Sequence, residues 1–277
     1  MQEPAHGLAS FAFKCELGRG SFGLTWKVCR KLDGQLHCIK VLALSEPAKK
    51  EYAVKYVSKL EQAKDEFEKM RRVHHENVVH ATDFGEAAPD AFWAQLEYCA
   101  GGDLKGRLSA ATIKERGGLD EPTAWRWQCE CIAGLEAIHA SGITHRDIKP
   151  ENIMLTAADD ATANCKLGDL GLALEVENTM KSIQGGKVGT LNYMAPEVLA
   201  GGTYSARADV YSLGMVLFEL TCSGALKFRD GEDDPQNDSK NFALLPEGRG
   251  KILTLHALER KKDRVSSKEL HEHARRI

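Results

Sequence analysis

Residues 145–152 read His145-Arg146-Asp147-Ile148-Lys149-Pro150-Glu151-Asn152. This octapeptide combines a carboxylate at Asp147, an ammonium at Lys149 and an amide at Asn152. The segment before it opens with Asp120-Glu121-Pro122, which is typical of a helix start because Asp caps free N–H groups and Pro is tolerated in the first turn. The octapeptide is therefore predicted to form a loop after a helix. Such a loop suits activation of a hydroxyl at Asp147 and binding of a metal ion at Asn152.

The N-terminal part of the chain consists of strand-like segments. Apolar and polar residues alternate there in short runs, which favours strands over helices. The runs are Phe11–Cys15, Leu24–Cys29, Leu36–Leu42, Val78–Phe84 and Ala91–Tyr98. Turn-forming residues at 18–23 and at Asp33-Gly34 separate the first three runs. The pattern predicts an antiparallel sheet.

Helical periodicity is typical of the remaining segments. Between the third and fourth strand-like runs, Phe67, Met70 and Val73 are spaced so that they share one helical face. After Ala100-Gly101-Gly102 the chain becomes mainly helical, and Val210–Leu220 is apolar enough for a buried helix. The sequence therefore predicts an α+β fold, with the sheet first and most helices after it.

A glycine-rich motif, Leu17-Gly18-Arg19-Gly20-Ser21-Phe22-Gly23, lies between two predicted strands. Where side chains are missing, backbone amides can approach phosphate oxygens closely. A dinucleotide-binding fold would need a helix after this motif, whereas Leu24–Cys29 continues as a strand. A P-loop would need Gly-Lys-Ser/Thr, which the motif lacks. The motif therefore predicts phosphate binding by a turn of the sheet.

Lys40 lies 17 residues after Gly23 on a predicted strand, from which its ammonium could reach phosphate groups. Lys55 is a competing candidate. It stands only 11 residues before Glu66, which leaves little chain for a strand end, a turn and most of a helix. We therefore predict that Lys40 binds phosphate and that Glu66, on the following helix, orients it. Glu68 is the weaker alternative partner.

The composition of the chain disfavours several classes of protein. Its 277 residues are 43% hydrophobic, which suits one large domain or two modest ones. A formal net charge of −3 offers no basic field for nucleic acid or a membrane surface. The eight cysteines include one close pair, Cys129 and Cys131, in a C-x-C spacing that is not typical of zinc or redox sites. Free thiols in a reducing compartment are expected.

Neither a signal peptide nor a membrane span is expected from the sequence. Residues 1–10 carry no apolar signal-peptide core, and no apolar run approaches the roughly 20 residues of a membrane span. We expect a soluble, cytoplasmic protein, with access to the nucleus left open.

Further motifs follow the octapeptide in order along the chain. They are Asp169-Leu170-Gly171, Ala195-Pro196-Glu197, Asp209-Val210-Tyr211-Ser212-Leu213-Gly214 and Arg264. Together with the octapeptide and the glycine motif, they resemble the eukaryotic-type protein kinase superfamily from about Phe11 to Leu270. The resemblance implies an N-terminal tail at 1–10, a small antiparallel-sheet N-lobe with one main helix at 11–98, and a larger, mainly helical C-lobe at 99–277.

The resemblance implies a role for each polar residue of the octapeptide region. Asp147 would accept or orient the proton of the substrate hydroxyl, and Lys149 would neutralise charge on the transferring phosphoryl group. Asn152 and Asp169 would hold Mg²⁺. The implied catalytic residues are Asp147, Lys149, Lys40 and Glu66.

The resemblance also implies an ATP site. Leu96 would be the gatekeeper, the hinge after it would offer backbone hydrogen bonds to adenine, and Asp103 would suit the ribose. Cys38 and Met154 would sandwich the adenine ring, and Thr25 replaces the valine that the family prefers. The implied nucleotide-binding residues are Leu17, Gly18, Gly20, Ser21, Phe22, Gly23, Thr25, Cys38, Lys40, Leu96, Glu97, Cys99, Asp103 and Met154.

Two features resemble the Ser/Thr branch of the superfamily. Lys149 stands two residues after Asp147, and Gly189-Thr190 precedes the segment Tyr193–Glu197. The implied activity is transfer of the γ-phosphoryl group of ATP to Ser or Thr hydroxyls of protein substrates.

Arg146 beside Asp147 implies regulation by phosphorylation of the activation segment, because an arginine there favours a nearby phosphate. Thr179, Ser182 and Thr190 are the candidate acceptors, and hydroxyls that are merely exposed in a loop are the competing interpretation. An upstream kinase or autophosphorylation in trans would supply the phosphate.

The sequence departs from the family pattern at several positions. Leu170 replaces a phenylalanine, Thr156–Asn164 is a long insertion, Ala81 stands where a larger residue is common, and the region after Leu220 is short. A pseudokinase that binds nucleotide as a scaffold is the alternative function, which the presence of all the metal- and phosphate-binding residues disfavours. A kinase acting on a small molecule is disfavoured by the complete segment Thr190–Glu197.

Overall fold

The computed structural model describes residues 7–20, 23–43, 64, 67–68, 70–88, 91–110, 113, 118–169, 192–222, 248–259 and 262–277. These residues belong to two compact units. The first unit is Met1–His74 with Val79–Tyr98, and the second is His75–Val78 with Cys99–Ile277.

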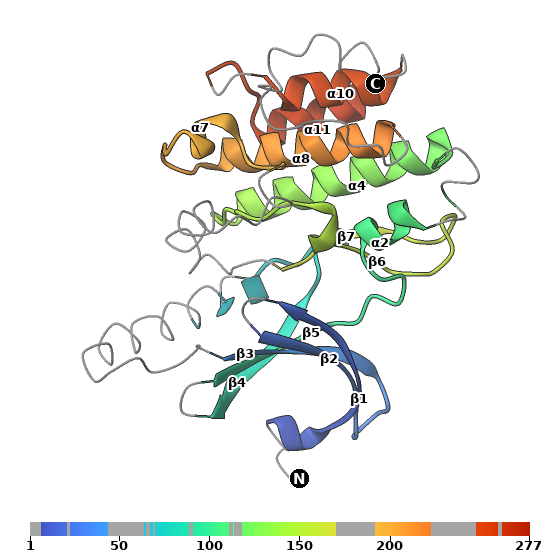
Figure 1. Cartoon of the computed structure of the whole chain (residues 1–277), viewed down its shortest axis with the longest axis vertical. Coiled ribbons are helices and arrows are strands. Elements are labelled where there is room, and N and C mark those ends of the chain that lie inside the picture. The colour runs from blue at the N-terminus through green and yellow to red at the C-terminus, as the bar shows by residue number, and fades with distance from the viewer. Residues whose placement is uncertain are drawn as a thin grey trace. The chain divides into compact units, whose positions relative to one another are not determined.

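The first unit is built on a five-stranded antiparallel sheet with the strand order β1-β2-β3-β5-β4 (Figure 1). A short 3-10 turn, η1 (Leu8–Ser10), precedes it. The strands are β1 (Phe11–Gly20), β2 (Gly23–Arg30), β3 (Leu36–Ala43), β4 (Ala81–Ala88) and β5 (Ala91–Glu97). This sheet confirms the predicted antiparallel architecture.

Apolar side chains of β1, β2, β3 and β5 form the core on one face of this sheet. Phe11, Val28, Ile39 and Trp93 are buried together. The rings of Phe11 and Trp93 meet edge to face, with centroids 6.3 Å apart. Burial of these apolar side chains and the contact between the two rings stabilise the sheet.

The predicted helical face is also present in this unit. The described residues between 64 and 71 are helical, and Phe67, Met70 and Val73 are all buried. The Phe67 ring packs against the rings of Phe84 and Phe92, at centroid distances of 4.9 and 5.9 Å. The helical segment is therefore fixed to β4 and β5.

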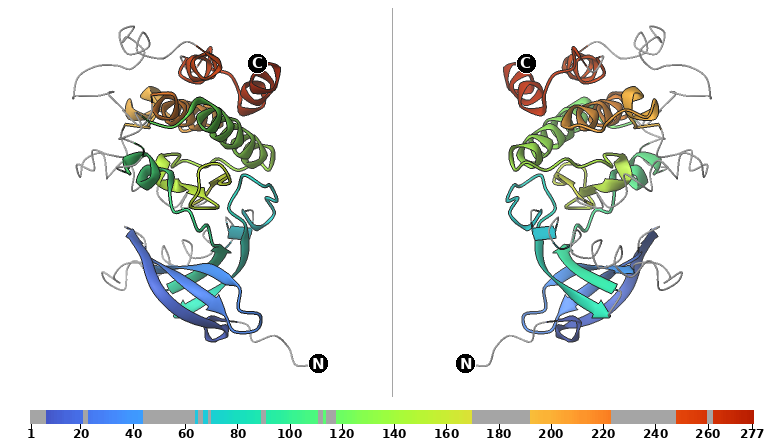
Figure 2. Two further views of the ribbon diagram at one scale, coloured as in Figure 1. Left: turned by 90° about the vertical axis from the view of Figure 1, so that its right-hand side faces the viewer. Right: turned by 90° about the vertical axis from the view of Figure 1, so that its left-hand side faces the viewer.

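The second unit is mainly helical, as predicted. Its described helices are α2 (Leu104–Ser109), α4 (Glu121–Ala140), α7 (Pro196–Leu199), α8 (Ala206–Thr221), α10 (Arg249–Ala257) and α11 (Ser267–Arg276). A 3-10 turn, η3 (Pro150–Asn152), leads into a two-stranded antiparallel sheet of β6 (Ile153–Leu155) and β7 (Cys165–Leu167). Figure 2 shows α4 and α8 lying side by side at the centre of this unit.

Two tryptophans on α4 differ in their environment. Trp127 is fully buried, and its indole N–H donates to the carbonyl of Ala163 at 2.9 Å. Trp125 lies under the guanidinium of Arg249, 4.5 Å from the ring centroid. Both side chains pack within the protein, and only Trp127 belongs to the core.

Helix α8 is buried from Ala208 to Leu220. This apolar length confirms the prediction of a core helix.

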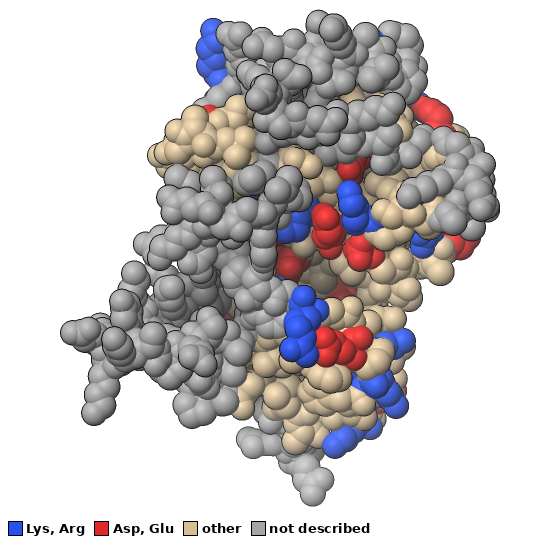
Figure 3. Space-filling view, viewed as in Figure 1, with Lys and Arg blue, Asp and Glu red and all other residues tan. Residues whose placement is uncertain are grey.

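In the part of the chain that the structure describes, no helix is both long enough and apolar enough to cross a bilayer. On the face drawn in Figure 3, charged side chains of both signs lie interspersed among the described residues.

Candidate active site

Asp147, Lys149 and Asn152 meet around one carboxylate in the second unit. Lys149 Nζ lies 2.6 Å from Asp147 Oδ2, and Asn152 Nδ2 donates to the same oxygen at 2.8 Å. Asn152 Nδ2 also donates to the backbone carbonyl of Asp147 at 2.7 Å. Asn152 is buried, whereas the Asp147 side chain is 37% exposed. Lys149 and Asn152 thus orient the Asp147 carboxylate, which stays accessible to an incoming group.

The backbone of the octapeptide loop is held by Asp209 on α8. Its carboxylate accepts the N–H groups of His145 at 2.7 Å and Arg146 at 2.8 Å. Arg146 has a φ of 70°, a left-handed conformation that costs energy for a side chain of this kind. Two bonds to a buried charge offset that cost, so Asp209 fixes the turn that presents Asp147.

Asp209 stays ionised although it is fully buried. Burial alone would raise its pKa, but hydrogen bonds from His139 Nε2 at 2.9 Å and Tyr204 Oη at 2.7 Å bring the pKa below its ordinary value. His139 and Tyr204 were not predicted from the sequence. The nearest available signal was a histidine in the last turn of the helix that leads into the loop.

His145 connects the loop to the residue before Asp169. Its Nε2 lies 3.0 Å from the carbonyl of Gly168, and its Nδ1 lies 3.4 Å from the Asp147 N–H. Because a carbonyl only accepts, these contacts fit an imidazole protonated at Nε2. The Gly168 N–H donates to Asn152 O at 2.8 Å. Asp169, with a φ of 58°, therefore follows a segment that is tied to both His145 and Asn152.

Asn152 and Asp169 carry the oxygen atoms that Mg²⁺ prefers. The Asn152 amide nitrogen is occupied by Asp147, which leaves its carbonyl oxygen as the atom that could accept a metal ion. One carboxylate and one amide oxygen suit a Mg²⁺ ion that also binds phosphate oxygens. No cluster of three or more His, Cys, Asp or Glu that could form an all-protein metal site occurs among the described residues.

Two predicted nucleotide-binding residues of the second unit are neighbours. Asp103 forms an isolated β-bridge with Met154, and its side chain accepts the Gly106 N–H at 2.7 Å as the N-cap of α2. Cys99, just before this segment, is buried. The carboxylate of Asp103 is thus held in place by the helix that it caps.

The predicted residues of the first unit lie in adjacent strands. Lys40 on β3 is paired with Thr25 on β2, and Cys38 is paired with Leu96 on β5. Lys40 and Cys38 are two residues apart and therefore share one face of the sheet. Burial raises the pKa of the Cys38 thiol to about 11, so the thiol is neutral and acts as a small apolar side chain.

The glycine motif lies where β1 meets β2. Gly18 is paired with Thr25 and Gly20 with Gly23. Leu17 precedes them on β1 and is 45% exposed, and Glu97 is the last residue of β5. Ser21 and Phe22 lie outside the described residues.

Several other predicted residues also lie outside the described part of the chain. They are Glu66, Lys55, Leu170, Thr179, Ser182 and Thr190. Glu68, the weaker alternative to Glu66, is described and pairs with Arg71 at 3.0 Å.

Glu197 and Arg264, which both belong to the motifs that resemble the family, form an ion pair. Arg264 Nη1 and Nη2 bind the two Glu197 oxygens at 2.7 and 3.3 Å, and the arginine side chain is fully buried. Its guanidinium also donates to the carbonyls of Arg207 and Glu259 and lies 4.8 Å from the Tyr211 ring. This bidentate pair joins α7 to α8 and to the segment that precedes α11.

Comparison with known proteins agrees with these features. The chain is 32% identical over 213 residues to Serine/threonine-protein kinase ATG1b of Arabidopsis thaliana, covering 77% of this chain and 28% of that protein. It is 36% identical over 216 residues to CBL-interacting protein kinase 30 of Oryza sativa subsp. japonica, covering 77% and 42%. The chain thus spans less than half the length of these relatives.

The family profile described as "Protein kinase domain" matches residues 11–273, which is nearly the whole chain. The same residues include the octapeptide loop, its anchor on α8 and the paired Glu197 and Arg264. The chain belongs to the protein kinase domain family.

Proposed function

We propose that this chain is a serine/threonine protein kinase that transfers the γ-phosphoryl group of ATP to Ser or Thr hydroxyls of protein substrates. The observation that carries the proposal is the Asp147 carboxylate, which Lys149 and Asn152 hold through Oδ2 on a loop anchored by Asp209. Relatives named as serine/threonine-protein kinases support the choice of acceptor.

Asp147 would orient the acceptor hydroxyl and receive its proton as the new bond between oxygen and the γ-phosphorus forms. The bond between the γ-phosphorus and the bridging oxygen breaks in the same step, and ADP leaves with that oxygen. The Lys149 ammonium, 2.6 Å from that carboxylate, would balance negative charge on the phosphoryl group. Bound through Asn152 and Asp169, Mg²⁺ would supply charge neutralisation at the phosphates. Because phosphoryl transfer needs little covalent help, positioning and electrostatics would account for most of the rate.

Each unit carries residues that would bind ATP. On the first unit, Lys40, oriented by Glu66, and the glycine motif would bind phosphates, while Thr25, Cys38 and Leu96 would contact adenine. On the second unit, Met154 and Asp103 would contact adenine and ribose. The N-lobe of the kinase domain would comprise residues 11–98, and the C-lobe would comprise residues 99–277.

Phosphorylation within the activation segment, at Thr179, Ser182 or Thr190, would regulate the enzyme through Arg146. The phosphate would come from an upstream kinase or from a second copy acting in trans.

All eight cysteines are described, and none forms a disulfide, which supports a reducing location such as the cytoplasm.

Turnover of ATP and Mg²⁺ on a generic basic protein tests this function. Asp147→Asn and Asp169→Asn should each lower turnover by at least about 100-fold, because each removes a group that acts on the reacting phosphate or hydroxyl. Asp159→Asn, on an exposed turn of the second unit, is the matched control and should keep wild-type turnover. Equal phosphorylation by wild type and Asp169→Asn would instead favour the scaffold alternative.

A further inference from the structure

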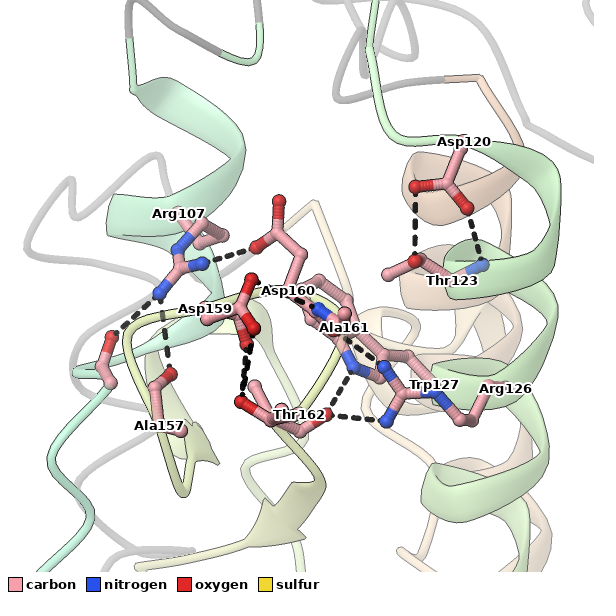
Figure 4. A network of polar contacts seen from close by, with 12 residues as sticks. Arg107, Asp120, Thr123, Arg126, Trp127, Ala157, Asp159, Asp160, Ala161 and Thr162 are labelled. Carbon is pink, nitrogen blue, oxygen red and sulfur yellow. Dashed lines mark hydrogen bonds and ion pairs between the residues drawn. The ribbon is translucent and has the colours of Figure 1, made fainter.

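The inserted loop at 156–164 is attached to two helices of the second unit (Figure 4). It connects β6 to β7, and Asp160 lies near its middle. Arg107 approaches the loop from α2, and Arg126 approaches it from α4. The loop is therefore a bridge between two elements that are distant in sequence.

On the α2 side, Arg107 forms an ion pair with the Asp160 carboxylate. The same guanidinium donates to the carbonyls of Ala157 at 3.4 Å and Gly101 at 3.5 Å. Arg107 and Asp160 are only 14% and 20% exposed. A pair so largely removed from water is less screened than a surface ion pair, and the loss of either partner leaves a charge without compensation.

On the α4 side, the backbone of the loop is held independently of Arg107. Arg126 donates to the carbonyls of Asp160 at 2.5 Å and Ala163 at 2.6 Å, and the Trp127 indole donates to Ala163 O at 2.9 Å. These bonds hold the backbone of Asp160 in place, and its carboxylate therefore determines where the Arg107 side chain lies.

Arg107 in turn contacts the segment that carries Asp103. The Gly101 N–H donates to Leu155 O, and the Leu155 N–H donates to Gly102 O, each at 2.8 Å. A β-carbon at Gly101 would lie only 2.1 Å from Ala157 O, so this segment fits closely against the beginning of the inserted loop. A small shift of the loop would therefore move the segment before Asp103.

We propose that Asp160 is a positioning residue for the nucleotide. Through Arg107 it fixes residues 101–103 against β6, and so sets the place of the Asp103 carboxylate relative to Met154. The inference rests on the proposed function, in which Asp103 and Met154 contact ribose and adenine. It gives the inserted loop a role in substrate affinity rather than in chemistry.

The test compares ATP KM, kcat and the calorimetric Kd for ADP in wild type and Asp160→Asn. The variant keeps the size of the side chain and removes its charge. We expect the KM for ATP and the Kd for ADP to rise about three- to tenfold, with kcat within about twofold. The preference for ATP over 2′-deoxy-ATP should also weaken, because residues 101–103 would shift relative to Met154 and move Asp103 away from the ribose.

Two further variants keep the test decisive. Asp159→Asn is the matched control, since its carboxylate contacts only Thr162 and Ala161 among described residues, and its nucleotide constants should equal those of wild type. Arg107→Lys keeps the positive charge but loses the forked guanidinium, and it should shift the ATP KM in the same direction as Asp160→Asn.

A purely structural role would give a different pattern. A lower Tm and kcat in Asp160→Asn, with unchanged ATP KM and ADP Kd, would overturn the inference while leaving the proposed function intact. A wild-type chain that neither binds ADP nor turns over ATP would overturn both.

Discussion

Asp209 illustrates how one side chain can organise a site without touching the reacting groups. It is a fully buried carboxylate that accepts hydrogen bonds from two backbone amides of the octapeptide loop and from His139 and Tyr204. An ionised group at this depth is tolerated only when such partners compensate its lost hydration. The sequence indicated the importance of Asp209, but its partners on α4 and before α8 depend on tertiary packing.

Glu219, at the other end of α8, provides a pH-dependent prediction. Burial raises its pKa above 4.5, although Lys105 at 3.6 Å and the Tyr193 hydroxyl at 3.0 Å act in the opposite direction. The folded state thus binds this proton more tightly than the unfolded state. The contribution of Glu219 to the free energy of unfolding should fall as pH rises from 4.5 through the folded pKa.

Glu219→Gln removes the titration and keeps an acceptor for Tyr193. The free energy of unfolding of the variant minus that of wild type should therefore increase with pH through this window. Urea unfolding at several pH values from about 4 to 7 measures the difference. A difference that does not change with pH would contradict the assigned pKa direction.

At the scale of elements, local sequence patterns predicted those parts of helices and strands that short-range interactions determine. The start of α4 follows from Asp120 and Pro122, and the apolar run of α8 was predicted from Val210, although the helix begins at Ala206. Strand β1 was predicted to end at Cys15 but continues to Gly20. Glycines carry no side chains whose alternation could reveal a strand, and their pairing with β2 decides the extension.

The N-cap of α4 gives a prediction at this scale. Asp120 Oδ1 accepts the Thr123 N–H at 2.8 Å, and Oδ2 accepts the Thr123 hydroxyl at 3.0 Å. Asp120→Ala should lower the free energy of unfolding by about 1 kcal/mol, because the first-turn amide loses its acceptor. Asp120→Asn, the control, keeps a capping oxygen and should lose clearly less. Equal losses in urea denaturation would show that the cap itself contributes little.

At the scale of the whole molecule, the predicted site residues are distributed over two units. Lys40 belongs to the first unit, whereas Asp147, Asn152 and Asp169 belong to the second. Each of these four residues could be predicted from the sequence, because each belongs to a motif within a single loop or strand. The bonds from the inserted loop to Arg107 and Arg126 could not be predicted, because no local pattern specifies which arginine on α2 or α4 will face Asp160.

Substitution of a proposed nucleotide-binding residue should weaken ADP binding strongly, whichever unit carries that residue. ADP with Mg²⁺ at about 100 times Kd should stabilise the wild-type chain by about 2.7 kcal/mol, because the ligand binds the folded state alone. Lys40→Met and Asp169→Asn should each remove most of this stabilisation, whereas Lys14→Met, on exposed β1, should keep it. Thermal unfolding with and without ADP measures the effect. A full shift retained by one of the two site variants would mean that the substituted residue contributes nothing to nucleotide affinity, and its assignment to the ATP site would have to be withdrawn.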